Sequence, residues 1–154
     1  MNLPDAAATE AAGARLEGLV RGGDAIALVG ELGAGKTTFT AGLVAALGGE
    51  GAHSPTFSLV HEYTDGRLIV WHADLYRLER EAGLVELGLD EVLGDHRGIV
   101  IVEWADRFAV MPADHLRVEL HHAGGARELV ATGTGARGRE LAIGLDPGSA
   151  ASLG

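Results

Sequence analysis

The chain has 154 residues, a length that suits one domain. Hydrophobic residues make up 47% of it, and no apolar run approaches the roughly 18 residues of a membrane-spanning helix. The sequence has no cysteine, which excludes disulfides, thiolate metal sites and a cysteine nucleophile. A formal net charge of −10 argues against an autonomous nucleic-acid binder, because the protein as a whole would repel a phosphate backbone. We therefore expect a globular, cytoplasmic protein without a membrane span.

The N-terminal third of the chain predicts a helix, a buried strand, a Gly-rich turn and a second helix. Apolar residues recur at helical spacing over 6–21, where Thr9 is a plausible start. The continuous apolar run over 25–29 is typical of a strand that is buried on both faces. A Gly-rich turn covers 30–35, and a helix with one apolar face follows over 36–47. This order places the Gly-rich turn at the carboxyl end of a strand.

The rest of the chain predicts two hairpins, one further buried strand and a helix in two pieces. In chain order these are a hairpin over 57–63 and 68–72, a mostly helical stretch over 78–93 broken near Gly88, a strand over 99–102, and a hairpin over 115–121 and 128–132. The composition then becomes rich in Gly, Ala, Ser and Pro. We therefore expect one domain over 1–133, and a Gly/Ala-rich C-terminal segment over 134–154 that is partly disordered.

The Gly-rich turn matches the phosphate-binding P-loop pattern G-x-x-x-x-G-K-[ST], from Gly30 to Thr37. Glycines let the backbone fold around phosphate oxygens, and the amides at the start of a helix present partial positive charge to them. Lys36, which is the only lysine of the chain, is expected to reach the β- and γ-phosphates. The hydroxyl of Thr37 is expected to ligate Mg²⁺. The motif and its strand–turn–helix context predict a nucleoside triphosphate site.

Two acidic residues follow apolar runs at the ends of predicted strands. Asp74 ends the run that begins at Leu68, and Glu103 follows four consecutive β-branched residues. Because ligands of open α/β sheets lie beyond the carboxyl ends of the strands, both carboxylates are placed where Mg²⁺ or an attacking water would sit. Glu103 is the better candidate for the metal-associated acid of a P-loop protein.

Four segments in series make the chain resemble one known family. They are Gly30–Thr38, Ser54–Phe57, His72–Arg77 and Glu103–Trp104. Together they closely resemble the bacterial family of small ATPases required for tRNA threonylcarbamoyladenosine biosynthesis, TsaE, also called the YjeE family. The resemblance covers roughly residues 6–133, in order and with natural spacings, and only the C-terminal tail falls outside it.

The resemblance implies a fold, an activity and partners. The fold is α/β: a single P-loop NTPase-like, three-layer domain with a mainly parallel central sheet and antiparallel hairpin additions. The implied activity is slow, Mg²⁺-dependent ATP hydrolysis. The implied partners are the threonylcarbamoyl transferase TsaD and its paralogue TsaB, which together modify the adenosine beside the anticodon (t6A37) in tRNAs that read codons beginning with A. The ATPase would support multiple turnovers without performing the transfer, and it would reach tRNA only through its partners.

The resemblance also assigns roles to single residues. Lys36, Asp74 and Glu103 are the expected catalytic residues, and Thr37 and Glu103 are the expected Mg²⁺ ligands. Thr56 lies in a switch-like loop where it would sense the γ-phosphate. The implied nucleotide-binding residues are Thr9, Gly30, Glu31, Leu32, Gly33, Ala34, Gly35, Lys36, Thr37, Thr38, Thr56 and Trp104.

Several positions keep two interpretations. Thr9, which the resemblance places near the adenine, is equally explained as a helix N-cap. His72 is either a strand-end histidine of the core or part of the site. Glu31, Ala73 and Ala105 depart from the residues usual in the family, namely Asp, a bulky apolar residue and Pro, and they put local packing in question more than activity.

Two other functions remain as alternatives to the partner-coupled ATPase. A small-molecule kinase could use the same P-loop with Arg77, Arg80 or Arg107, although no lid-like insertion is evident. A non-enzymatic module could bind nucleotide only to stabilise its fold, but two acids placed near the expected phosphate site argue against it. A GTPase is disfavoured, because the chain has no N-K-x-D guanine motif.

Overall fold

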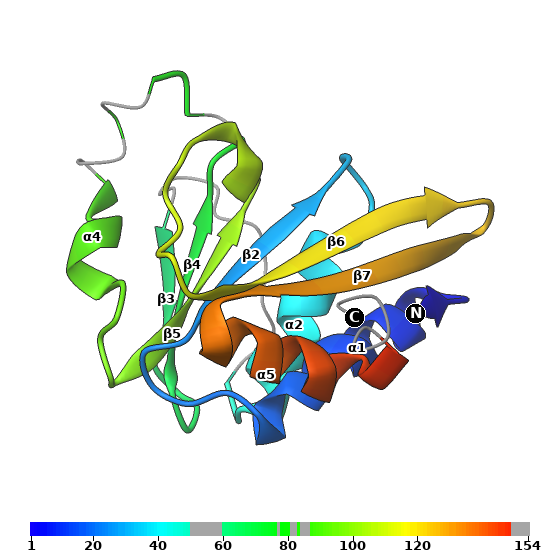
Figure 1. Ribbon diagram of the computed structural model, residues 1–154, viewed down its shortest axis with the longest axis horizontal. Helices are drawn as coiled ribbons and strands as arrows, with labels where there is room; N and C mark the ends of the chain where they lie inside the picture. The colour runs from blue at the N-terminus through cyan, green and yellow to red at the C-terminus, as the bar shows by residue number, and fades with distance from the viewer. Residues whose placement is uncertain (50–59, 77, 81–82, 84–86, 149–154) are drawn as a thin grey trace.

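The computed structural model describes residues 1–49, 60–76, 78–80, 83 and 87–148. These residues form one mixed sheet with helices against it (Figure 1). The strands are β1 (Asn2–Leu3), β2 (Ala25–Gly30), β3 (Val60–Tyr63), β4 (Ile69–Asp74), β5 (Gly98–Glu103), β6 (His115–Ala123) and β7 (Ala126–Thr134). The helices are α1 (Ala6–Arg15), α2 (Lys36–Ala46), α4 (Leu89–Val92) and α5 (Gly135–Leu145), with the 3-10 turns η1 (Leu16–Gly18) and η2 (Ala105–Arg107).

The seven described strands lie in the order β1-β7-β6-β2-β5-β4-β3. The central strands β6, β2, β5 and β4 are parallel, whereas β3 pairs antiparallel at one edge and β7 and β1 pair antiparallel at the other. The expectation of a parallel centre with antiparallel hairpins at its edges is therefore confirmed. Parallel neighbours need a long crossover connection, and the neighbours β4 and β5 are joined by the stretch that contains α4.

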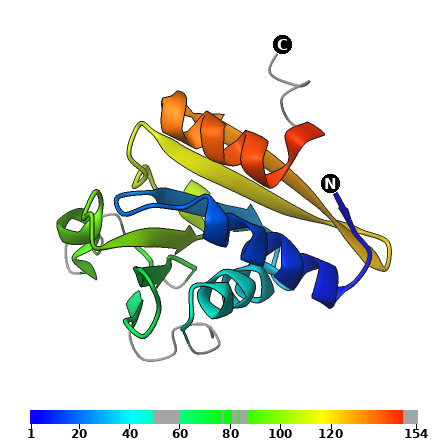
Figure 2. The same ribbon diagram turned by 90° about the horizontal axis from the view of Figure 1, so that it is seen from below.

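Two cores lie on opposite faces of the sheet. In β2, Ile26 and Leu28 face the larger core, where they pack with the buried side chains of α1, α2 and α5. Ala27 faces the smaller core on the other side, with Leu89 of α4. Figure 2 shows the helices α1, α2 and α5 along the sheet from below. Alternating side chains of buried strands explain why one continuous apolar run supplies both cores.

The helices α1 and α2 approach each other closely at Gly42. A Cβ atom at this position would lie 1.9 Å from the backbone oxygen of Glu10. A larger residue at Gly42 would therefore force the two helices apart. The contact matters for function because α2 begins at the Gly-rich turn and α1 packs beside it.

The element boundaries agree with most of the sequence predictions, with one correction at the first helix. This helix begins at Ala6, and its N-cap is Asp5, whose Oδ1 accepts the N–H of Ala8 at 2.8 Å. The start at Thr9 and its interpretation as an N-cap are therefore wrong. Thr9 lies inside α1 and is buried. The Asp5 side chain accepts one of the free amides of the first turn, so the helix begins at Ala6, where the apolar pattern over 6–21 begins, and not at Thr9.

The hairpins over 60–74 and 115–134 are present, and part of the predicted broken helix is seen as well. The helix α4 begins directly after Gly88, whose φ of 73° is left-handed, and this agrees with a break near that residue. Residues 57–59 and parts of the stretch 78–88 lie outside the described residues. None of the helices among the described residues is long and apolar enough to cross a membrane.

The C-terminal part of the chain contains a helix that the sequence did not predict. α5 packs on β6 and β7, and its residues Leu141, Ala142 and Leu145 belong to the larger core. The guanidinium of Arg137 donates to both carboxylate oxygens of the buried Asp24, at 2.9 and 2.7 Å. A division of the chain at residue 133 would separate this helix from the core that it completes. Residues 149–154 of the expected tail lie outside the described residues.

Candidate functional site

The candidate site lies where three neighbouring parallel strands end. β2 leads into the Gly-rich turn, β4 ends at Asp74 and β5 ends at Glu103. In the strand register Asp74 is paired with Glu103, and Glu103 is paired with Leu28 of β2. Because the strands are parallel, these ends meet at one edge of the sheet, which is where open α/β sheets bind ligands. The register therefore brings both predicted acids to the Gly-rich turn.

The turn passes into α2 through Gly35, which is the N-cap of this helix. Gly35 has a φ of 106°, a left-handed value that favours glycine, and a Cβ there would lie 3.3 Å from Cγ2 of Thr9. The first amides of α2 have no partner within the helix and carry the positive end of its dipole. An anion that enters the turn would meet these amides, as the P-loop pattern predicts.

Lys36 is folded back onto the turn. Its Nζ donates to the carbonyl oxygens of Gly30 at 2.7 Å and Glu31 at 2.9 Å, and it lies 4.3 Å from the centre of the Trp104 ring. Burial lowers the pKa of Lys36, while the nearby carboxylates, Glu103 first, act in the opposite direction. The ammonium group is thus held by neutral carbonyls and an aromatic face, interactions that a phosphate with full negative charge would replace.

A pocket of about 220 Å³, here called the phosphate pocket, opens between the turn and the strand ends. Its lining residues are Leu32, Gly33, Gly35, Lys36, Thr37, Thr38, Asp74, Tyr76, Glu103 and Trp104. Burial raises the pKa of Asp74, although the N–H of Tyr76, which donates to Oδ1 at 2.9 Å, opposes this effect. The nearby Glu103 raises the pKa of Asp74 further. A carboxylate in this setting is a better proton acceptor than an exposed one.

His72 is at the site and makes a buried contact with Glu103. Its Nε2 is hydrogen-bonded to Oε2 of Glu103, and both side chains are almost completely buried. The other ring nitrogen, Nδ1, has no hydrogen-bond partner among the described residues. His72 is therefore both a buried histidine of the sheet and a neighbour of the site, since it contacts a predicted metal-associated acid.

Trp104 has an unusual backbone that turns its ring toward the phosphate pocket. Its φ of 58° is the only positive value of a non-glycine residue among the described parts of the chain. The ring lies 4.9 Å from that of Tyr76 and faces Lys36. Arg107 supports this corner, because its guanidinium donates to the carbonyl oxygens of Leu75, at 3.1 Å, and of Tyr76. Strained conformations of this kind concentrate at functional sites.

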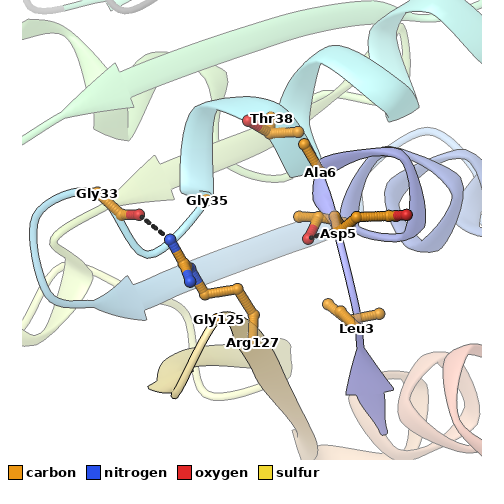
Figure 3. A pocket seen from close by; sticks show the side chains of 9 residues that line it. Leu3, Asp5, Ala6, Gly33, Gly35, Thr38, Gly125 and Arg127 are labelled. Atoms are coloured by element: carbon orange, nitrogen blue, oxygen red, sulfur yellow. Dashed lines mark hydrogen bonds between the residues drawn. The ribbon is translucent and has the colours of Figure 1, made fainter.

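A second pocket of about 150 Å³ also borders the Gly-rich turn (Figure 3). It is lined by Leu3, Asp5, Ala6, Thr9, Gly33, Gly35, Thr38, Gly125 and Arg127. The tip of the β6–β7 hairpin reaches over the turn here, and Nη2 of Arg127 donates to the Gly33 oxygen at 3.2 Å. Three residues, Gly33, Gly35 and Thr38, line both pockets. Both pockets therefore border the Gly-rich turn and the start of α2.

Sequence reasoning missed the hairpin tip and Asp5. Arg127 and Gly125 lie far along the chain from the Gly-rich turn, and no local motif marks them. Asp5 could have been found, because an Asp immediately before a helical apolar pattern is an N-cap signal.

The remaining predicted nucleotide-binding residues differ in how far their side chains are exposed. Ala34 is buried in the larger core, and the side chains of Glu31 and Leu32 are exposed, Leu32 at 71%. The switch-like loop over 54–57, which contains Thr56, lies outside the described residues, and so does Arg77.

The donor set of the phosphate pocket fits Mg²⁺ shared with phosphates. The hydroxyl of Thr37 and the carboxylates of Glu103 and Asp74 supply oxygen ligands, which Mg²⁺ prefers. Within the described residues no three His, Asp or Glu side chains gather to hold a metal by themselves. Such a site would depend on phosphate oxygens and waters for the remaining ligands, as is usual for Mg²⁺ in nucleotide sites.

Comparison with known proteins places this arrangement in a family. Residues 3–129 match the family model described as "Threonylcarbamoyl adenosine biosynthesis protein TsaE". The chain belongs to the TsaE family. The family that the motifs indicated is therefore confirmed. The match begins at β1 and includes both pockets, and it ends within β7, before α5.

Individual TsaE relatives agree with this assignment. A tRNA threonylcarbamoyladenosine biosynthesis protein TsaE from Bacillus subtilis is 42% identical over 118 residues, which is 75% of this chain and 73% of the relative. The TsaE of Streptomyces coelicolor is 40% identical over 136 residues, which is 81% of this chain and 90% of the relative. The crystal structure of Bacillus subtilis YdiB superposes with a TM-score of 0.77 at 34% identity and covers 94% of this chain and 90% of its own. The superposition supports the mixed α/β fold and extends beyond the family match toward α5.

Proposed function

We propose that this protein binds and hydrolyses ATP with Mg²⁺ and acts in the formation of threonylcarbamoyladenosine (t6A37) in tRNAs that read codons beginning with A. Membership of the TsaE family supports the pathway. The observation that carries the ATPase is the phosphate pocket, where a P-loop lysine, the Thr37 hydroxyl and two strand-end carboxylates line one hollow. The same observation supports a P-loop NTPase-like domain. The proposed location is the cytoplasm.

Different groups of the chain would bind the phosphates and the Mg²⁺ ion. The first amides of α2 face the turn and favour an anion there. Lys36 leaves the carbonyl oxygens of Gly30 and Glu31 for the phosphates, because a charge-assisted bond is stronger than the neutral bonds that it replaces. Thr37 and Glu103 would hold Mg²⁺. Bound Mg²⁺ would neutralise charge on the phosphate oxygens.

Asp74 is the proposed residue that orients the attacking water and accepts its proton. Its carboxylate lines the phosphate pocket, and burial raises its pKa toward the range where a base is effective. Among the residues that the structure describes, Tyr76 at the edge of this pocket is 48% exposed. We propose that intrinsic hydrolysis is slow and that a partner completes the site.

The second pocket is the proposed place of the base and ribose. It adjoins the P-loop through Gly33, Gly35 and Thr38, and Thr9 lines it. The family resemblance implies a position near the adenine for Thr9, and the place of this residue beside Gly35 supports that role.

The proposed partners are proteins of the TsaD and TsaB type. The acidic chain is suited to contact tRNA only through such partners, which would carry the positive charge that binds the tRNA backbone. Tyr76, Arg77 and the loop over 54–57 are the proposed segments that couple the nucleotide state to partner contact. The coupling would support multiple turnovers of the transferase, which itself forms the new bond.

The test is ATP hydrolysis by the purified protein, alone and then with the partner pair and tRNA. We expect a low basal rate that rises in the full assembly and is lost in Lys36→Ala. Assembly turnover that is equal with wild-type protein and with Lys36→Ala would refute the proposal. A rate that ignores the partners and rises strongly with one metabolite would favour a small-molecule kinase instead.

A further inference from the structure

His72 occupies a position where the sheet would ordinarily place an apolar side chain. It lies in the middle of β4, between Val70 and Asp74 on the same face, and its relative exposure is 0%. Its neighbours in sequence, Trp71 and Ala73, belong to the smaller core on the opposite face. An imidazole at such a site loses its hydration, and an aliphatic side chain would fill the volume without that loss.

The described hydrogen bond of the His72 ring is made with a residue of the candidate site. Nε2 is hydrogen-bonded to Oε2 of Glu103, and Nδ1 has no hydrogen-bond partner among the described residues. A histidine retained only to support the core would be expected to satisfy both ring nitrogens, because an unpaired buried polar atom is unfavourable. The single bond is directed instead at a carboxylate that lines the phosphate pocket.

The bond constrains how Glu103 presents its carboxylate. With Nε2–H donated to Oε2, this oxygen faces into the protein, and rotation of the carboxylate would break the hydrogen bond. Oε1 is then the oxygen available to the phosphate pocket. Groups that hydrogen-bond to metal-ligating carboxylates fix their orientation, and removal of such groups typically weakens metal binding 10- to 100-fold.

We propose that His72 is a positioning residue that orients the Glu103 carboxylate and so sets the affinity of the site for a divalent cation bound with nucleotide. The inference rests on the proposed function, because it takes Glu103 as a metal ligand. His72 itself contacts neither nucleotide nor metal in this arrangement. Its effect is therefore confined to metal-dependent steps, whereas the P-loop binds phosphates without it.

The experiment separates metal-dependent from metal-independent nucleotide binding. ADP and a non-hydrolysable ATP analogue are titrated calorimetrically into the purified full chain, in EDTA and over a series of Mg²⁺ concentrations. We expect His72→Leu, which keeps bulk but has no donor, to raise the Mg²⁺ concentration for half-maximal enhancement of binding about 10-fold or more. Its affinity for nucleotide in EDTA should stay within about twofold of wild type.

The matched variants distinguish orientation from packing. His72→Gln places an amide donor near the position of Nε2 and should restore the Mg²⁺ dependence to within about threefold of wild type. His72→Asn, whose donor is too short to reach, should behave as His72→Leu does, and it replaces that variant if the leucine does not fold. His115→Leu removes a histidine at the opposite end of the parallel strands and should leave the Mg²⁺ dependence unchanged.

Two results would overturn the proposal while leaving the proposed function intact. One is an unchanged Mg²⁺ requirement in His72→Leu or His72→Asn. The other is a His72→Gln protein as impaired as His72→Leu, which would show that packing and not the donor matters. If wild-type protein itself binds nucleotide with no response to Mg²⁺, the metal site of the proposed function fails, and this inference fails with it.

Discussion

The C-terminal helix should depend for its docking on the pair formed by Arg137 and Asp24. The carboxylate of Asp24 is 4% exposed and receives two bonds from the Arg137 guanidinium, which also donates to the Leu19 oxygen at 2.5 Å. In Arg137→Met the stem of the side chain is retained, but the buried carboxylate loses its charged partner. The α5 helix would then keep its apolar face and the two backbone N–H groups, of Arg137 and Gly138, that donate to the Asp114 carboxylate.

The expected loss is large for a single substitution. Removal of one member of a buried ion pair typically costs about 3–5 kcal/mol, because the remaining charge is left without compensation. The N–H of Arg21, which still donates to Asp24 at 2.8 Å, places this case at the lower end, about 3 kcal/mol. For a chain of this size each kcal/mol lowers Tm by about 2–4 °C, so we expect a decrease of about 6–12 °C.

Urea and thermal unfolding followed by circular dichroism measure this loss. Arg139→Met, an exposed arginine of the same helix, is the matched control and should change the free energy of unfolding by less than about 0.5 kcal/mol. Asp24→Asn combined with Arg137→Met should be more stable than Arg137→Met alone, since no buried charge remains. A loss below about 1 kcal/mol in Arg137→Met, or an equal loss in the control, would refute the reasoning.

Three further predictions concern the site and its scaffold. Burial raises the pKa of Asp74, so the ionised carboxylate destabilises the fold as the pH rises above the usual Asp range. Asp74→Asn should therefore raise Tm at pH 8, and this gain should shrink toward about pH 4. ATP hydrolysis should be lost in the same variant. A lower Tm at pH 8 would contradict this sign. Gly42→Ala should lower the free energy of unfolding measured in urea by about 1–3 kcal/mol, because the added Cβ would overlap a carbonyl of α1. Gly18→Ala is the control, since a Cβ at Gly18 would have open space around it. Equal losses in the two variants would argue against close packing of α1 and α2. Arg127→Ala should weaken nucleotide binding by about threefold to tenfold in calorimetry, since it releases the Gly33 oxygen and the hairpin tip; an unchanged affinity would separate the hairpin from the site.

The local parts of the site follow from the sequence. The P-loop pattern is continuous in the chain, and its glycines and lysine carry their roles in their own backbone and side-chain chemistry. The placement of Asp74 and Glu103 also follows, because a buried parallel strand is a continuous apolar run and its carboxyl end is where ligands bind. The family assignment rests on such motifs in series, and the comparisons confirm it.

The first and last helices show where the sequence was insufficient. The apolar pattern over 6–21 includes α1, but the α-helix ends at Arg15 and a 3-10 turn follows to Gly18. Thr9 is buried beside Gly35 and is not at the helix start. The glycine- and alanine-rich composition after residue 133 indicated a separate segment. Composition describes intrinsic helix preference, whereas α5 is stabilised by the apolar face and the arginine that it buries against the sheet.

Only the tertiary structure determined which groups meet in the site. The buried bond between His72 and Glu103 joins two strands, and the contact of Arg127 with Gly33 brings the tip of a distant hairpin to the Gly-rich turn. Each depends on strand order and register, which are set by long-range packing of the whole sheet and leave no pattern within a short window of sequence. The sequence by itself therefore determined the chemistry available to this protein, because that chemistry resides in contiguous motifs. The tertiary structure decided the partners and orientation of each group, because those depend on contacts between segments far apart in the chain.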